Sequence, residues 1–295
     1  MQHYKTSPTA YALPPMGEGK EHTKGGNDMT KGKKLAATIL ATLALSATVC
    51  AAPRSASEQI QIFAETANSG QEGGWFVSPE KDADWNRWFY AVTDLDHDGR
   101  LEIFKAKRGG EGIAPEIRCE EFNENGGRTW GLFFAGGSDV PDIMTNESAA
   151  EPRVFYERAD DRYNYIFVSS KELDEDEWDY VDTKVAVTLR GDLQIEDLAM
   201  VKAKLPAPGS DLAERKFFLP GWLKVEAESG QVGSPEEIDA ERFANIESEH
   251  FPGAEKTYAI ISWYRAEEIQ KRIGSAELPK VLESSYNAFE NSGKR

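Results

Sequence analysis

A short acidic run carries the clearest chemistry of this chain. It reads Asp94-Leu95-Asp96-His97-Asp98-Gly99-Arg100-Leu101-Glu102, with Asp at three alternate positions, then Gly, then Glu three residues after the glycine. Calcium is a hard cation that binds six to eight oxygen atoms at about 2.3–2.6 Å. Alternate Asp side chains in a tight loop converge on one point, and a glycine permits the sharp turn. The run therefore predicts a Ca²⁺ site with the ligands Asp94, Asp96, Asp98, Arg100 (through its carbonyl) and Glu102.

This run resembles known calcium loops. Its opening is similar to an EF-hand loop, although Lys105 occupies the twelfth position, where that family has a bidentate Glu. The closer resemblance is to the strand–loop–strand loops of FG-GAP and integrin-type propeller blades, whose ninth position carries an acid, here Glu102. It implies the same five ligands and extends to the loop alone, because a propeller needs several copies and the sequence has one. The wider chain resembles secreted proteins of anaerobic bacteria with a Tyr-Ala-Val-Thr-Asp-x-Asp-x-Asp-Gly segment, which implies no particular activity.

The segments beside the loop have the composition of β-strands. Aromatic and β-branched runs predict strands at Trp88–Thr93 and Leu101–Lys107. The loop is thus expected to join two strands, unlike the helix–loop–helix of an EF-hand. Similar runs, separated by Gly, Asp and Asn, predict further strands at Thr129–Ala135, Val154–Glu157, Tyr163–Ser169, Thr183–Leu189 and Leu193–Ile195, the last two joined by a turn at 190–192.

Amphipathic helices are predicted before and after this β-rich region. The first is Ser57–Ala67. Ser234 as N-cap and Pro235 at the first helical position predict a second helix, which runs to about residue 249. The spacing at Lys256–Tyr264 fits a buried strand. Two more helices are predicted at Ala266–Ile273, ended by Gly274, and at Pro279–Phe289.

Together these elements predict an α+β fold. It comprises a largely antiparallel β region with an N-terminal helix and a helical C-terminal part. The predicted organisation is a leader at 1–51, a linker and N-terminal helix at 52–72, a β-rich domain with the calcium loop at 73–230, and a helical part at 231–295 that packs on the β region.

The leader has the layout of a secretory signal peptide. Over Met29–Ala51, lysines precede the uncharged apolar stretch Leu35–Val49, and small residues close it. That stretch is shorter than the roughly 20 residues of an ordinary membrane span, so no span is predicted for the mature chain. A secreted or periplasmic location follows. Cys50 resembles the lipidated cysteine of a bacterial lipoprotein, although Val49 replaces the small residue expected before it. The remaining cysteine, Cys119, is predicted to be a buried or half-buried small residue and not a catalytic thiol.

Composition excludes several functional classes. The formal net charge is −17 and the chain has four histidines. Such an acidic chain is a poor partner for nucleic acid, whose phosphates need Lys and Arg. The sequence has no His-Glu-x-x-His and no Gly-x-Ser-x-Gly motif, which leaves carboxylates as the groups available for hydrolysis. Glycoside hydrolysis needs two such acids, and sugars could stack on Trp75, Trp85, Trp88 and Trp130.

These features predict a secreted calcium-binding protein without catalytic activity, in which the ion is the structural clasp of a β-hairpin. Two alternatives stay open. One is a secreted carbohydrate-active hydrolase that uses carboxylates. The other is an extracellular adhesion or interaction module, whose calcium-held hairpin presents a surface to an envelope or extracellular partner. The sequence identifies neither that partner nor a catalytic residue.

Overall fold

Two antiparallel β-sheets form the framework of the described chain. The computed structural model describes residues 54–67, 74–110, 112–121, 131–136, 140–173, 177–205, 214–220 and 234–292, with only the backbone at 131–136. One sheet has the strand order β12-β1-β2-β3-β4 and the other the order β10-β9-β8-β7-β6-β5-β11. All the pairings are antiparallel. The sheets and the flanking helices confirm the predicted α+β class.

The strands of both sheets come from segments between Trp88 and Arg265. The five-stranded sheet contains β1 (Trp88–Thr93), β2 (Glu102–Lys107), β3 (Glu116–Glu121), β4 (Gly131–Gly136) and the short β12 (Tyr264–Arg265). The seven-stranded sheet contains β5 (Arg153–Glu157), β6 (Arg162–Glu172), β7 (Tyr180–Leu189), β8 (Leu193–Lys204), β9 (Glu214–Leu219), β10 (Glu236–Ile238) and β11 (Glu255–Tyr258).

The helices are α1 (Ala56–Thr66), α2 (Ala240–His250), α3 (Ala266–Gln270) and α4 (Glu277–Ser292), with short 3₁₀ helices at Trp85–Arg87, Ile143–Thr145 and Glu147–Ala149. A capping box begins α1: the Ser55 side chain accepts from the Glu58 N–H, and the Glu58 carboxylate accepts from the Ser55 N–H. Such reciprocal bonds satisfy backbone donors that the first helical turn leaves without intrahelical partners. The helix therefore starts one residue before its predicted position.

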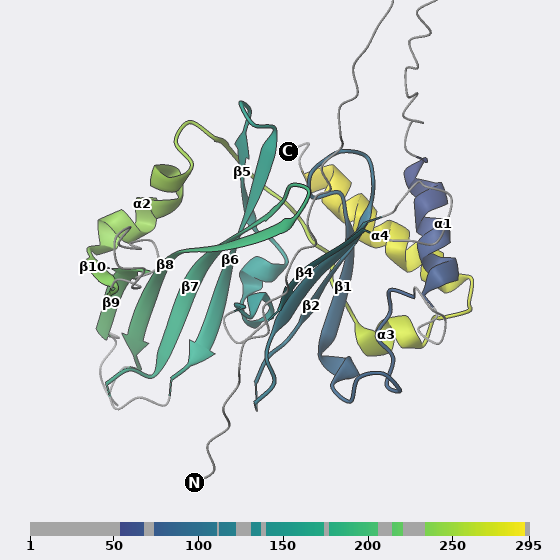
Figure 1. Ribbon diagram of the computed structural model, residues 1–295, viewed down its shortest axis with the longest axis horizontal. Coiled ribbons are helices and arrows are strands. Elements are labelled where there is room, and N and C mark those ends of the chain that lie inside the picture. Colours follow the sequence, from purple (N-terminus) through teal and green to yellow (C-terminus); the bar gives the residue numbers. More distant parts are fainter. Residues whose placement is uncertain are drawn as a thin grey trace, which may run out of the picture. The chain divides into compact units, whose positions relative to one another are not determined.

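Three apolar clusters separate the layers of the unit Ala51–Arg295. The first lies between the sheets and includes Phe104, Phe167 and Ile261. The second packs α1, α3 and α4 against the outer face of the five-stranded sheet, and the third packs α2 against the outer face of the seven-stranded sheet. Figure 1 shows α1, α3 and α4 beside β1 and α2 beside β8 and β9. Both sheets are thus covered on both faces.

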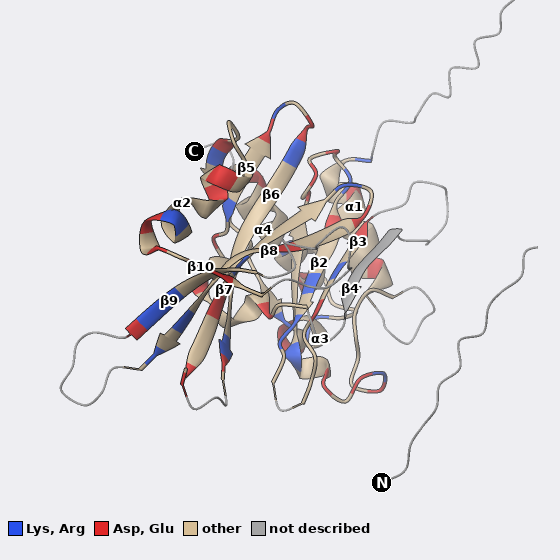
Figure 2. Ribbon diagram, turned by 60° about the vertical axis from the view of Figure 1, so that its left-hand side comes forward, with Lys and Arg blue, Asp and Glu red and all other residues tan. Residues whose placement is uncertain are grey.

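Because both faces of its sheet are covered, β2 is buried at every position. Successive side chains along a strand point to opposite faces of the sheet. Phe104 and Ala106 face the space between the sheets, whereas Ile103 faces the helices. Lys105 on the helix side is 2% exposed; its ammonium donates to the Trp75 carbonyl and pairs with Glu120. Elsewhere, basic and acidic residues are spread over the strands of both sheets and over the helices that cover them (Figure 2).

The predicted helix start at Ser234 is wrong. Glu236–Ile238 pairs as β10 with residues 217–219 of β9. The helix begins after Asp239, whose side chain accepts from the Arg242 N–H at 2.7 Å. Burial of Ile238 against the third apolar cluster favours the strand over the local capping pattern. The C-terminal segment also divides between the layers, since β11 joins the seven-stranded sheet and β12 the five-stranded one.

The predicted buried strand at Lys256–Tyr264 is wrong, because this segment comprises the mostly exposed edge strand β11, an irregular stretch at 259–263 and the first residue of β12. The remaining predicted elements differ from the observed ones mainly in length. The Trp88–Thr93 prediction coincides with β1, and the final helix extends the predicted Pro279–Phe289 at both ends. The predicted signal peptide Met29–Ala51 and the lipidation alternative at Cys50 lie outside the described residues. Within the described ranges, helices with both the length and the apolar character needed to cross a bilayer are absent.

Candidate metal centre

The loop that joins β1 to β2 brings three of the predicted ligands together. Asp94, Asp96 and Glu102 each offer a carboxylate oxygen, and these three oxygens lie within 4.8 Å of one another. Thr93 and Glu102 are cross-strand partners at the end of the hairpin, so the strands place the two ends of the loop side by side. This arrangement forms a three-carboxylate group that could hold a metal ion, as the spacing predicted.

Glu102 is the most buried member of the group. It is 0% exposed, and burial holds the pKa of its carboxyl well above the usual range. Its Oε2 accepts from the Leu95 N–H at 2.9 Å and from the Thr93 hydroxyl at 3.0 Å. No donor among the described residues reaches its buried Oε1. A buried carboxylate oxygen without a partner is costly, and a cation beside it would remove that cost.

The two aspartates also lie in a setting that opposes their negative charge. Burial raises the pKa of Asp94 to about 7, and the charges of Asp96 and Asp98 add to the increase. Burial, followed by the charge of Asp98, raises the pKa of Asp96 to about 6. Each accepts one long backbone hydrogen bond of 3.4 Å, Asp94 from Gly99 and Asp96 from Asp98. A divalent cation would stabilise the ionised form of both carboxylates.

The backbone of the loop turns sharply at two residues. Gly99 has φ +86° and His97 has φ +56°, both in the left-handed region. Glycine adopts this region without a Cβ clash, which explains the glycine in the motif. The His97 N–H donates to the Asp94 carbonyl at 3.3 Å and closes the turn.

Asp98 and Arg100 behave differently from the other predicted ligands. The Asp98 carboxylate lies outside the three-carboxylate group. Its Oδ1 accepts from the Arg100 N–H at 2.8 Å, and its Oδ2 lies 3.5 Å from Arg100 Nε. The ligand roles of the Asp98 side chain and of the Arg100 carbonyl stay predictions.

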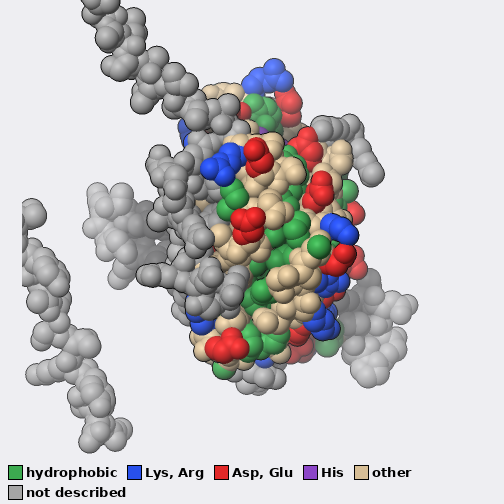
Figure 3. All heavy atoms as spheres, turned by 90° about the vertical axis from the view of Figure 1, so that its right-hand side faces the viewer, with side chains coloured by type: hydrophobic (Ala, Val, Ile, Leu, Met, Phe, Trp, Pro, Cys, Tyr) green, Lys and Arg blue, Asp and Glu red, His purple; other side chains and the backbone are tan. Residues whose placement is uncertain are grey.

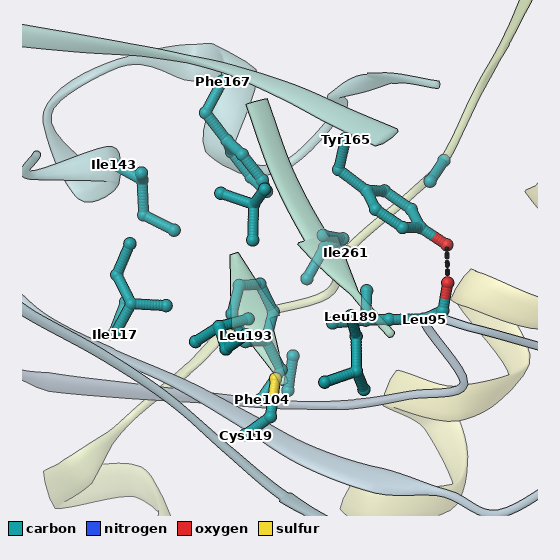
Figure 4. Close-up of a cluster of buried hydrophobic side chains, with 14 of the residues drawn as sticks. Leu95, Phe104, Ile117, Cys119, Ile143, Tyr165, Phe167, Leu189, Leu193 and Ile261 are labelled. Atoms are coloured by element: carbon teal, nitrogen blue, oxygen red, sulfur yellow. Dashed lines mark hydrogen bonds between the residues drawn. The ribbon is translucent and has the colours of Figure 1, made fainter. Parts of the chain in front are cut away.

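Two residues far away in the sequence anchor the loop. Gln59 of α1, which is 0% exposed, donates from Nε2 to the Gly99 carbonyl at 2.9 Å. Its Oε1 accepts from the Leu101 N–H at 2.8 Å. From β6, the Tyr165 hydroxyl donates to the Leu95 carbonyl at 2.9 Å (Figure 4). Sequence reasoning missed both anchors, although a glutamine four residues before Phe63 on the apolar helix face was a detectable signal.

His97 carries the loop's contacts to two further elements. Its ring centroid lies 4.0 Å from that of Tyr163 in β6 and 5.7 Å from that of Phe289 in α4. Its Nε2 lies 3.4 Å from the Tyr165 hydroxyl. The ring therefore packs against aromatic side chains, and it is not a member of the three-carboxylate group.

The three described tryptophans that were predicted to stack on sugars do not form an exposed surface. Trp75 is 0% and Trp88 is 1% exposed, because both belong to the cluster under α1 and α4. Trp85 is partly buried against the same cluster. Trp130 lies outside the described residues. Cys119 is buried between the sheets, as predicted.

Comparisons with protein-family models, with curated proteins and with solved structures find no match to this chain.

Proposed function

We propose that the β1–β2 loop binds one Ca²⁺ and that the ion acts as a structural clasp in a secreted or periplasmic protein. The observation that carries this proposal is the buried Oε1 of Glu102, which has no hydrogen-bond partner among the described residues and belongs to the three-carboxylate group. Its surroundings have the oxygen-rich, negatively charged character of a hard-cation site. Export rests on the predicted signal peptide.

The donor set favours calcium over other metals. The group among the described residues consists of carboxylates alone, without cysteine or histidine. Oxygen donors suit hard cations such as Ca²⁺, Mg²⁺ and Mn²⁺. Calcium tolerates an irregular shell of six to eight oxygens, whereas magnesium demands near-octahedral geometry and keeps several waters. A group of carboxylates drawn from one irregular loop therefore fits calcium better.

The clasp role follows from what the loop touches. Gln59 attaches it to α1, Tyr165 attaches it to β6, and His97 packs on α4. An ion that holds the loop in one shape would thereby order the contacts between the two sheets and the helix layer. Extracellular calcium modules bind with dissociation constants of about 0.1–1 mM, a range that suits a permanently loaded structural site.

The decisive experiment is a calcium titration of the mature chain by calorimetry, with Asp94→Asn and Glu102→Gln as loop variants. Both should lose at least about tenfold in affinity, since each removes a charged ligand. Glu237→Gln is the matched control, because Glu237 is an exposed acid on β10. A wild-type chain that binds no calcium, or loop variants that bind as well as the control, would refute the site.

The alternatives receive no comparable support. The side chains of Trp75 and Trp88, invoked for sugar stacking, are in the core. For an adhesion surface, the strongly exposed large apolar side chains among the described residues are Leu205 and Tyr258. Leu205 follows β8 and Tyr258 is on β11, with three strands between them. On the face with α1, α3 and α4, acidic side chains are scattered among other types (Figure 3).

A further inference from the structure

The strand that follows the β1–β2 hairpin carries another acid close to Glu102, although its carboxylate, like that of Asp98, lies outside the three-carboxylate group. In the register of β2 and β3, Glu121 lies directly opposite Glu102. Cross-strand partners project to the same face of a sheet, with Cβ atoms about 4.5–5.5 Å apart. Like charges in this arrangement repel each other, and here both acids are largely shielded from water: Glu102 is 0% exposed, and the Glu121 side chain is 12% exposed. The pair needs positive charge nearby.

Arg100 supplies part of that charge. Its guanidinium donates from an Nη to a Glu121 carboxylate oxygen at 2.8 Å. Arg100 is itself a loop residue, two positions before Glu102, so Glu121 already contacts the loop. The ion pair between Arg100 and Glu121 therefore joins β3 to the loop that holds the three-carboxylate group.

The group by itself has too few oxygens for calcium. Three carboxylates contribute at most six oxygens, and Oε2 of Glu102 already accepts two hydrogen bonds. Asp98 is engaged by the backbone and side chain of Arg100. Since calcium takes six to eight oxygens, further donors must come from water, from carbonyls or from the next acid. The acid opposite Glu102 is Glu121.

We infer that Glu121 is a further ligand of the metal centre and that Arg100 competes with the ion for it. This inference rests on the proposed calcium site. Glu102, the strand partner of Glu121, has a buried Oε1 without a hydrogen-bond partner among the described residues, which favours a cation near this residue pair. The Arg100 side chain is 45% exposed, and an ion pair so open to water contributes little to stability. An incoming divalent ion can therefore displace it.

The test uses the mature chain with calcium calorimetry and with Tb³⁺ luminescence lifetimes in H₂O and D₂O, which count the waters bound to the ion. Glu121→Ala should weaken calcium binding about tenfold and add about one bound water. Arg100→Gln, which keeps the main-chain carbonyl, should tighten binding in the wild-type background. Glu237→Ala removes one charge from a distant exposed position and should change neither readout.

The outcomes separate this inference from the proposed function. If Asp94→Asn abolishes binding while Glu121→Ala leaves affinity and water count unchanged, Glu121 is not a ligand and the calcium site stands. Weaker binding with an unchanged water count also overturns the inference, because it shows an effect of charge alone. If Asp94→Asn binds like the wild type, the site itself is wrong. Should Glu121→Ala fail to fold, Glu121→Gln replaces it with both readouts: a tenfold loss with an added bound water supports the inference, and an unchanged affinity or an unchanged water count overturns it.

Discussion

Gln59 and Gly99, forty residues apart in the sequence, are joined by a hydrogen bond of 2.9 Å from the Gln59 amide to the Gly99 carbonyl. The other end of the same amide accepts from the Leu101 N–H at 2.8 Å. One buried side chain of α1 thus satisfies two backbone groups of the β1–β2 loop. Gln59 thus couples α1 to the loop, although it is not a member of the three-carboxylate group.

Replacing Gln59 by Leu should destabilise the protein by about 1–3 kcal/mol, because it leaves the Leu101 N–H and the Gly99 carbonyl without this partner. Urea unfolding of the mature chain measures the change. Gln61→Leu on the same helix is the control; Gln61 is exposed and bonds to Glu65. Equal effects of the two substitutions would show that the Gln59 bonds contribute nothing specific. The Gln59 variant should also bind calcium more weakly, since its loop is less ordered.

Tyr165→Phe removes the hydroxyl that donates to the Leu95 carbonyl and keeps the ring in the core. We expect a loss of about 0.5–1.5 kcal/mol in the free energy of unfolding. Tyr258→Phe, at an exposed position, should change it by less than about 0.5 kcal/mol. Thermal unfolding of both variants provides the comparison. A Tyr165→Phe protein as stable as the control would mean that the bond to the loop is not a net stabilising contact.

Removal of calcium should lower the melting temperature. At free calcium tenfold above the dissociation constant, binding stabilises the folded state by about 1.4 kcal/mol. For a domain of this size, that corresponds to a shift of roughly 3–6 °C. Scanning calorimetry with and without a chelator measures it, and Glu102→Gln should lose the shift. An identical wild-type melting curve under both conditions would exclude a clasp.

The pair of His250 and Glu196 predicts a pH dependence distant from the metal loop. The hydrogen bond of 3.1 Å to Glu196 raises the pKa of His250, and the same bond lowers the pKa of Glu196. The contribution of His250 to the free energy of unfolding is complete below its unfolded pKa of 6.5. It is lost as pH rises through the higher pKa of the folded state. The glutamate contribution is complete above 4.5 and is lost as pH falls through its lower folded value.

The pair should therefore stabilise the fold most between about pH 4.5 and pH 6.5. Because both side chains are substantially exposed, the contribution should be about 1 kcal/mol or less. His250→Gln should reduce stability at pH 5.5 and have a smaller effect at pH 8.5, as measured by urea unfolding. Lys280→Gln, in an exposed pair on α4, is the control. An equal loss of stability at the two pH values would show that the charge of His250 does not stabilise the fold through Glu196.

The hairpin and its acidic loop were predictable because their determinants are local. Trp88–Thr93 coincides with β1, since a run of aromatic and β-branched residues that turn residues follow specifies a strand within a few positions. The same short range made the capping pattern at Ser234 misleading. Ile238 is buried beside β9, a contact that local sequence patterns do not reveal. The helix therefore begins only after its N-cap, Asp239.

Local sequence accounts for several carboxylates within one turn, for the glycine that follows them and for the two strands that flank them. The convergence of Asp94, Asp96 and Glu102, and the bonds between Asp98 and Arg100, depend on the folded chain. Long-range contacts also bring Gln59 and Tyr165 to the loop and Glu121 opposite Glu102. Spacing along the chain sets which side chains can meet locally, whereas burial and long-range hydrogen bonds select which oxygens are left without a partner.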